Sequence, residues 1–137
     1  MTERTAAALC VYDKEGRVLM QHHPEDAPVL PNYWGFFGGM VDGDEPPEQT
    51  VRRELYEKAG YRPHKPVFFV KEKSMVGGVH VLTYIFVEGY DESQPIILRH
   101  GQAYGWFTVA DALKLDISPA RGRTLRKIRR HLQNLSR

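Results

Sequence analysis

The segment from Gly39 to Tyr61 constrains the fold of this chain most, because it pairs a glycine with a helix whose two ends are marked. Pro47 suits the first turn of a helix, where the N–H that proline lacks would be unpaired in any case. Gly60 provides the residue without a β-carbon that a left-handed C-terminal cap prefers. Between these ends an apolar stripe recurs at every fourth residue, at Val51, Leu55 and Ala59. The sequence therefore predicts a helix from about Pro47 to Gly60 with one buried face.

Two glutamates lie beside that apolar stripe. At about 100° per residue, Glu54 and Glu57 are roughly 60° apart around the helix, so both carboxylates could meet one ion. Carboxylate oxygens are hard ligands and suit Mg²⁺ or Mn²⁺ better than zinc. The plainer interpretation is a solvent-facing helix with ordinary surface charges.

An aromatic strand is expected just before the helix. Residues 34–37, Trp-Gly-Phe-Phe, read as a short strand that runs into the pair Gly38-Gly39. The absence of side chains at a glycine pair lets backbone amides and carbonyls approach a ligand closely. We therefore expect a strand, a glycine loop and a carboxylate-bearing helix to converge on one site.

The complete spacing is similar to the signature of the Nudix hydrolases, which reads G, five residues, E, seven residues, then R-E-apolar-x-E-E-x-G-apolar. The matching positions are Gly39, Glu45, Arg53, Glu54, Leu55, Glu57 and Gly60. The resemblance implies an α+β fold of the α/β/α sandwich type, with a mixed sheet and a catalytic loop-helix-loop. It also implies divalent-cation-dependent hydrolysis of a nucleoside diphosphate linked to another group, with Mg²⁺ as the expected cofactor and Mn²⁺ as the second choice.

The resemblance also implies roles for single residues. The carbonyl of Gly39 and the carboxylates of Glu54 and Glu57 would hold the metal, with Glu45 as a further candidate ligand, and either Glu54 or Glu57 could orient or deprotonate water. Arg53 would steady the neighbouring carboxylates, Glu45 among them, by charge-assisted hydrogen bonds. Its plainer interpretation is an exposed ion pair with Glu57. The glycine pair, with Gly38 beside Gly39, is expected to contact the substrate.

Lys58 departs from the signature, because it stands where the family has its third helical glutamate. The change alters the local formal charge by two units. Lys58 also follows Glu54 by four residues near the negative end of the helix dipole, where it could simply neutralise that carboxylate. Three interpretations are open: a weakened or altered metal site, an ammonium that contacts substrate phosphate in place of one metal, or no effect. If catalysis is lost, the domain would bind nucleotide as a regulatory module.

A second departure concerns the segment Ile96–Gln102, which has no acidic residue where many family members supply another one. His100 stands there and is a candidate for substrate binding, although a surface histidine without a role is the alternative. Four acidic residues elsewhere could substitute for the missing one: Glu72, Glu88, Asp91 and Glu92.

The remaining sequence favours one domain over residues 1–137, since 137 residues with 42% hydrophobic content can bury one core. Strands are expected near residues 5–12, 17–22, 67–73, 79–87 and 104–108, a short helix near 110–115 and a further helix at the C-terminus. Cys10 is the only cysteine, which excludes an intramolecular disulfide and is consistent with the cytoplasm. The apolar run at residues 6–12 is too short to span a bilayer, so no membrane association is expected.

The C-terminal segment is basic and amphipathic. Residues 119–137 hold seven of the 19 Lys and Arg and none of the 17 Asp and Glu, so the preceding residues carry a net charge of −5. Leucine and isoleucine recur at helical spacing, which predicts a helix packed through its apolar side, with a solvated basic face. Nucleic acid is therefore not the expected partner. The expected partner is a nucleotide-type small molecule, by default a nucleoside triphosphate or nucleotide sugar, and a homodimer is a further expectation from the resemblance.

Overall fold

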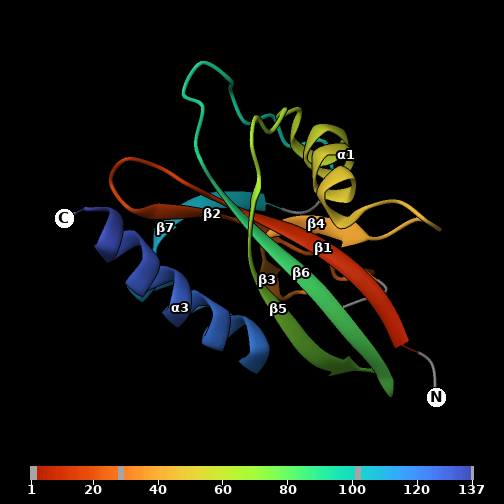
Figure 1. Ribbon diagram of the computed structural model, residues 1–137. Helices are drawn as coiled ribbons and strands as arrows, with labels where there is room; N and C mark the ends of the chain where they lie inside the picture. The colour runs from red at the N-terminus through yellow and green to blue at the C-terminus, as the bar shows by residue number, and fades with distance from the viewer. Residues whose placement is uncertain (1–2, 28–29, 101–102, 137) are drawn as a thin grey trace.

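The computed structural model describes residues 3–27, 30–100 and 103–136 (Figure 1). The strands within the described residues form one seven-stranded sheet. Its strands are β1 (Glu3–Tyr12), β2 (Arg17–His22), β3 (Trp34–Gly35), β4 (Phe37–Met40), β5 (Val67–Val76), β6 (Val79–Gly89) and β7 (Ala103–Thr108). The helices are α1 (Pro47–Ala59), α2 (Val109–Ala112) and α3 (Pro119–Leu135).

The sheet is mixed, as predicted. Its main path runs β3-β2-β1-β6-β5, while β4 pairs with β1 and β7 pairs with β2. β1 and β6 are parallel, and the other pairs are antiparallel. The central position of β1 between β6 on one side and β2 and β4 on the other explains its nearly continuous apolar sequence.

Helices cover both faces of the sheet. Along β1, Ala7, Leu9 and Val11 pack in a cluster with the buried stripe of α1. The alternate residues Ala8 and Cys10 pack in a second cluster with residues of α2 and α3. Figure 1 shows α1 and α3 on opposite sides of the strands. This arrangement is the α/β/α sandwich that the resemblance implied.

The helix α1 begins and ends where the sequence predicted. Pro46 has an extended conformation before the first turn, and Gly60 ends the helix with a φ of 64°. The N–H of Gly60 donates to the Tyr56 carbonyl oxygen at 3.0 Å. Because the residues of the apolar stripe are fully buried, the helix face beside them is held in a fixed orientation over the sheet.

The predicted strand at residues 34–37 was wrong in one respect, because it is interrupted at Phe36. β3 pairs with β2, whereas β4 pairs with β1. Phe36 is the residue at which the chain changes partner, and its carbonyl oxygen accepts a hydrogen bond from Gln21 Nε2 at 3.3 Å. The predicted helix near residues 110–115 is shorter than expected, since α2 ends at Ala112.

The basic helix α3 packs through its apolar residues, as expected. Leu125 and Ile128 are fully buried, whereas Leu135 near the end of the helix is 54% exposed. The basic side chains at 123, 126, 127, 129 and 130 belong to exposed residues. None of the helices in the described ranges combines the length and the apolar character needed to cross a membrane.

Candidate functional site

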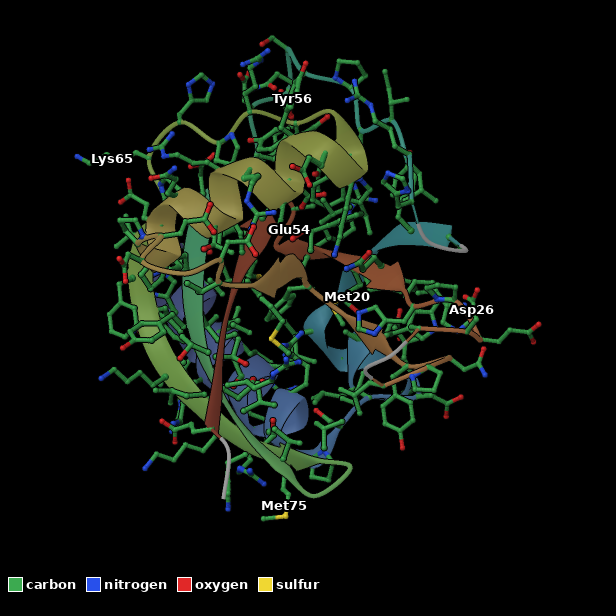
Figure 2. The ribbon with its side chains drawn as sticks, turned by 90° about the vertical axis from the view of Figure 1, so that its right-hand side faces the viewer. Met20, Asp26, Glu54, Tyr56, Lys65 and Met75 are labelled. Atoms are coloured by element: carbon green, nitrogen blue, oxygen red, sulfur yellow. The ribbon has the colours of Figure 1, made fainter. Side chains whose placement is uncertain are left out.

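The candidate site lies where α1 packs against β4 and β1. Glu54 lies next to the buried apolar stripe of α1 and is only 9% exposed. Figure 2 shows Glu54 on the sheet-facing side of α1 and Tyr56 on the opposite side of the same helix. The predicted helical spacing therefore places one of the two candidate glutamates against the sheet.

The glycine pair lies within strand β4, and the expected glycine loop is therefore a strand. Gly38 is opposite Ala8 of β1 and Gly39 is opposite Ala7. A β-carbon on Gly38 would collide with the backbone of β1, and one on Gly39 would collide with the Glu54 carboxylate. The missing side chains thus serve two close approaches within the protein, one to a neighbouring strand and one to Glu54.

Arg53 connects the carboxylates around the start of α1. Its Nε and Nη2 donate to the two oxygens of Glu45 at 2.9 and 3.0 Å, and its Nη1 donates to Glu54 Oε1 at 3.2 Å. The hydrogen bonds from Arg53 and Thr50 lower the pKa of Glu45 to about 2, and the same bond to Glu45 raises the pKa of Arg53. Arg53 also donates to the Met40 carbonyl oxygen at 3.3 Å, which ties α1 to the end of β4.

Glu54 lies between two cations. Its Oε1 accepts from Arg53, and its Oε2 lies 3.3 Å from Lys58 Nζ. Lys58 Nζ also donates to the Gly38 carbonyl oxygen at 2.5 Å. The position that departs from the signature therefore lies at the candidate site, in contact with both Gly38 and Glu54.

The carboxylates near α1 differ in how far other side chains engage them. Among the residues that the structure describes, no three His, Cys, Asp or Glu side chains are grouped so that they could hold an ion. Glu45 has both oxygens engaged by Arg53. Glu57 is the candidate ligand with most freedom, because its side chain is 53% exposed and its one ion pair within the described part of the chain is with Arg53 at 3.6 Å. The donor set suits an ion held in part by Glu57 and by a bound ligand.

A cavity of about 590 Å³ extends from this site across the sheet. One part of its lining consists of predicted site residues, namely Gly38, Gly39, Glu54, Lys58 and His100. Trp34 and Phe36, which begin the interrupted strand, line it as well. The structure therefore brings most of the predicted residues to one cavity, while Arg53, Glu45 and Glu57 stand beside it.

Further polar groups of the cavity come from distant parts of the sequence. Arg121 of α3 donates through Nε and Nη2 to the two oxygens of Glu72 on β5, at 3.2 and 3.3 Å. Its guanidinium carbon lies 4.4 Å from the centre of the Phe36 ring. Burial alone would raise the pKa of Glu72, but Arg121 and the hydrogen bond from Thr124 leave that pKa below its ordinary value. Sequence reasoning missed Arg121, which carried no signal beyond the general basic character of its helix.

The other acidic candidates lie elsewhere. Glu88 accepts from the backbone N–H groups of His64 and Lys65, Asp91 pairs with His64, and Glu92 pairs with Lys14. None of these three residues lines the cavity, whereas the fourth candidate, Glu72, does. His100 is exposed at the cavity edge, and the last two residues of its segment, 101 and 102, lie outside the described residues.

Comparison with known proteins supports these observations. A family model described as NUDIX domain matches residues 1–128. The CMP-5'-(N-acetyl-N-hydroxy-3-aminopropyl)phosphonate hydrolase of Streptomyces rubellomurinus (strain ATCC 31215) is 30% identical over 114 residues, which cover 80% of this chain and 54% of that protein. The chain thus spans about half the length of that relative.

Two further proteins are similar over more of their own length. The CTP pyrophosphohydrolase of Escherichia coli (strain K12) is 24% identical over 112 residues, 80% of each chain. A crystal structure of MutT protein from Methanosarcina mazei Go1 superposes with a TM-score of 0.82 at 20% identity, over 95% of both chains. The similarity to this MutT structure supports the fold alone, because the sequence identity is only 20%.

Proposed function

Because the chain belongs to the Nudix hydrolase family, which the domain match over residues 1–128 shows, we propose that it cleaves a phosphoanhydride bond in a nucleoside diphosphate linked to a second group. The observation that carries this proposal is the position of Glu54. Its carboxylate is fixed by Arg53 and Lys58 at the wall of a cavity of about 590 Å³. A fixed carboxylate beside a cavity of that size suits hydrolysis of a nucleotide-type substrate.

In this proposal the residues of the site divide the work. Either Glu54 or Glu57 orients or deprotonates the attacking water. Arg53 keeps Glu45 and Glu54 in place through its three short contacts. The fixed positions of these carboxylates matter because a general base must lie within hydrogen-bond reach of the proton that it removes.

Nudix hydrolases generally use divalent metal ions, and we propose Mg²⁺, with Mn²⁺ as an alternative, for this chain. Glu57 and Glu54 with the carbonyl of Gly39 are the proposed protein ligands, and Glu45 contributes through its contact with Arg53. A divalent ion would offset negative charge on the phosphates during cleavage. The exposed carboxylate of Glu57 is the group most ready to accept it.

The substrate class is proposed to be a nucleoside triphosphate or a nucleotide sugar. The phosphates would lie beside Gly38, Gly39, Lys58 and His100, and the base would lie toward Trp34 and Arg121. Arg121 lines the same cavity as Trp34, and its guanidinium could donate to a base oxygen. Two relatives are named for cytidine compounds, which makes cytidine nucleotides the first compounds to test.

A regulatory domain that binds nucleotide without cleaving it is the second candidate. The pairing of Lys58 with Glu54 favours it, because an ammonium 3.3 Å from that carboxylate repels a divalent cation. The hydrolase and the regulatory domain would both bind nucleotide, but only the hydrolase would cleave it.

The cellular setting is also a proposal. The free Cys10 is buried and burial raises its pKa to about 12, which agrees with an unreactive thiol in the cytoplasm. We further propose that residues 1–137 act as one domain and that two copies associate, which sedimentation measurements would test.

The proposed activity is tested by measuring phosphate and pyrophosphate release from CTP, the other nucleoside triphosphates, nucleotide sugars and dinucleotides. Each compound is incubated with Mg²⁺, with Mn²⁺ and with chelator. Metal-dependent release from one class supports the hydrolase. Binding of nucleotides without release from any of them would support the regulatory domain instead.

A further inference from the structure

The ammonium of Lys58 occupies a position between two oxygen ligands. Lys58 Nζ donates to the Gly38 carbonyl oxygen at 2.5 Å and lies 3.3 Å from Glu54 Oε2. A backbone carbonyl and a carboxylate are the kinds of oxygen that bind hard cations in proteins. The last turn of α1, where Lys58 stands, also favours positive charge through the helix dipole.

The same ammonium can also donate to a ligand. A lysine ammonium carries three N–H groups. Among the residues with described positions, Lys58 Nζ donates one hydrogen bond, to the Gly38 carbonyl oxygen, and forms an ion pair with Glu54. Lys58 lines the cavity, and its side chain is 28% exposed. The ammonium can therefore donate to an anionic group bound in the cavity.

We propose that Lys58 is a built-in cation that takes the place of one divalent ion and donates a hydrogen bond to a phosphate oxygen of the substrate. This inference rests on the proposed function, since it assigns the phosphates to the Lys58 end of the cavity. An ammonium held between Gly38 and Glu54 excludes a divalent ion from that position by occupancy and by charge repulsion. The chain would then use fewer metal ions than three helical glutamates could hold.

The first test counts bound Mn²⁺ without nucleotide, by electron paramagnetic resonance and calorimetry. Lys58→Glu removes the ammonium and adds a carboxylate, so it should bind at least one more Mn²⁺ per chain than the wild-type protein. Lys65→Glu is the matched control, because it makes the same charge change at an exposed residue that Figure 2 shows well away from Glu54. Equal Mn²⁺ binding by Lys58→Glu and Lys65→Glu would overturn the proposal.

The second test measures binding of inorganic pyrophosphate in the presence of chelator. Lys58→Met keeps most of the side-chain volume and should weaken this metal-free binding about tenfold, as expected for loss of one charge-assisted hydrogen bond. Lys65→Met should bind like the wild-type protein. Unchanged affinity in a folded Lys58→Met protein, as judged by circular dichroism, would refute the phosphate contact.

Neither measurement depends on turnover, so the two proposals can fail separately. An absence of release from every nucleotide would reject the hydrolase and leave the Mn²⁺ and pyrophosphate results in force. If Lys58→Glu does not fold, Lys58→Met still decides the inference through the pyrophosphate measurement.

Discussion

The carboxylate of Glu54 fills the space in which a β-carbon on Gly39 would lie. This close approach joins α1 to β4 at the candidate site and explains why a glycine is needed there. It requires no unusual backbone conformation, because Gly39 is part of a regular antiparallel pair with Ala7. The glycine is required by the position of a neighbouring side chain.

Gly39→Ala should therefore displace Glu54 and lower hydrolysis by about a hundredfold, as expected for a misplaced catalytic group. The free energy of unfolding should fall less than it would after a collision with backbone, because the Glu54 side chain can move aside. Turnover at saturating substrate and urea denaturation measure the two effects. Gly89→Ala is the control, since a β-carbon there would make only ordinary contacts with Tyr12 at 3.6 Å or more.

Gly38→Ala, unlike Gly39→Ala, should affect the free energy of unfolding most. Its β-carbon would meet the Ala7 carbonyl oxygen and the Ala8 α-carbon of β1. Those atoms belong to the central strand, so β4 would have to move away from it. We expect a large loss of stability in urea denaturation, and an equally stable Gly38→Ala protein would contradict the described packing of β4.

Glu54→Gln should reduce metal-dependent hydrolysis by at least about a hundredfold, the usual contribution of a general base. The substitution keeps the size of the side chain and removes its charge, so the fold should remain. Glu48→Gln makes the same change at an exposed position in the first turn of α1 and should leave turnover unchanged. Equal kcat/KM for Glu54→Gln and the wild-type protein would reject the assignment of Glu54.

The dependence of stability on pH should reveal the bond between Arg53 and Glu45. The pKa of Glu45 is lowered from its ordinary value of 4.5 to about 2. A lowered acid pKa adds stability above its ordinary value, and that stability is lost as the pH falls from about 4.5 toward 2. Arg53→Lys removes the two-point contact, so acid unfolding should begin at a higher pH.

Urea midpoints measured between pH 7 and pH 2 would check this expectation. Arg129→Lys on the exposed side of α3 is the control and should follow the wild-type curve. Superimposable curves for Arg53→Lys and Arg129→Lys would show that the contact with Glu45 does not influence stability.

Much of this architecture could be predicted from local sequence. The start and end of α1 follow from Pro47 and Gly60, and the hairpin of β5 and β6 turns at Gly77-Gly78, whose φ angles are both positive. These features depend on backbone preferences that a few neighbouring residues determine. The relation of Arg53 to Glu45 could likewise be anticipated, because both lie in one spaced motif.

Other features depend on contacts between distant segments. The interruption at Phe36 arises because β3 and β4 pair with different strands, which no local pattern encodes. Lys58 could be recognised as a departure from the sequence, but its bond to Gly38 required the packing of α1 on β4. The partners Arg121 and Glu72 are 49 residues apart, so only the fold reveals them as a pair.

The pair of Arg121 and Glu72 leads to a prediction about stability and about how stability changes with pH. Arg121→Met would leave Glu72, whose side chain is 6% exposed, as a buried charge without its partner. Loss of one member of such a pair costs about 3 kcal/mol of unfolding free energy or more. Without Arg121 the pKa of Glu72 should rise above its ordinary value, because burial then dominates.

An acid with a raised pKa in the folded state is stabilised by protonation, so Arg121→Met should gain stability, relative to the wild-type protein, as the pH falls. The double variant Arg121→Met with Glu72→Gln should recover much of the loss at pH 7, since it removes the unpaired charge. Urea denaturation at pH 5 and pH 7 distinguishes these cases, with Arg130→Met on the exposed face of α3 as the control. A loss in Arg121→Met that neither falls at pH 5 nor is reduced by Glu72→Gln would mean that Arg121 stabilises the fold through packing on Phe36 instead of through charge.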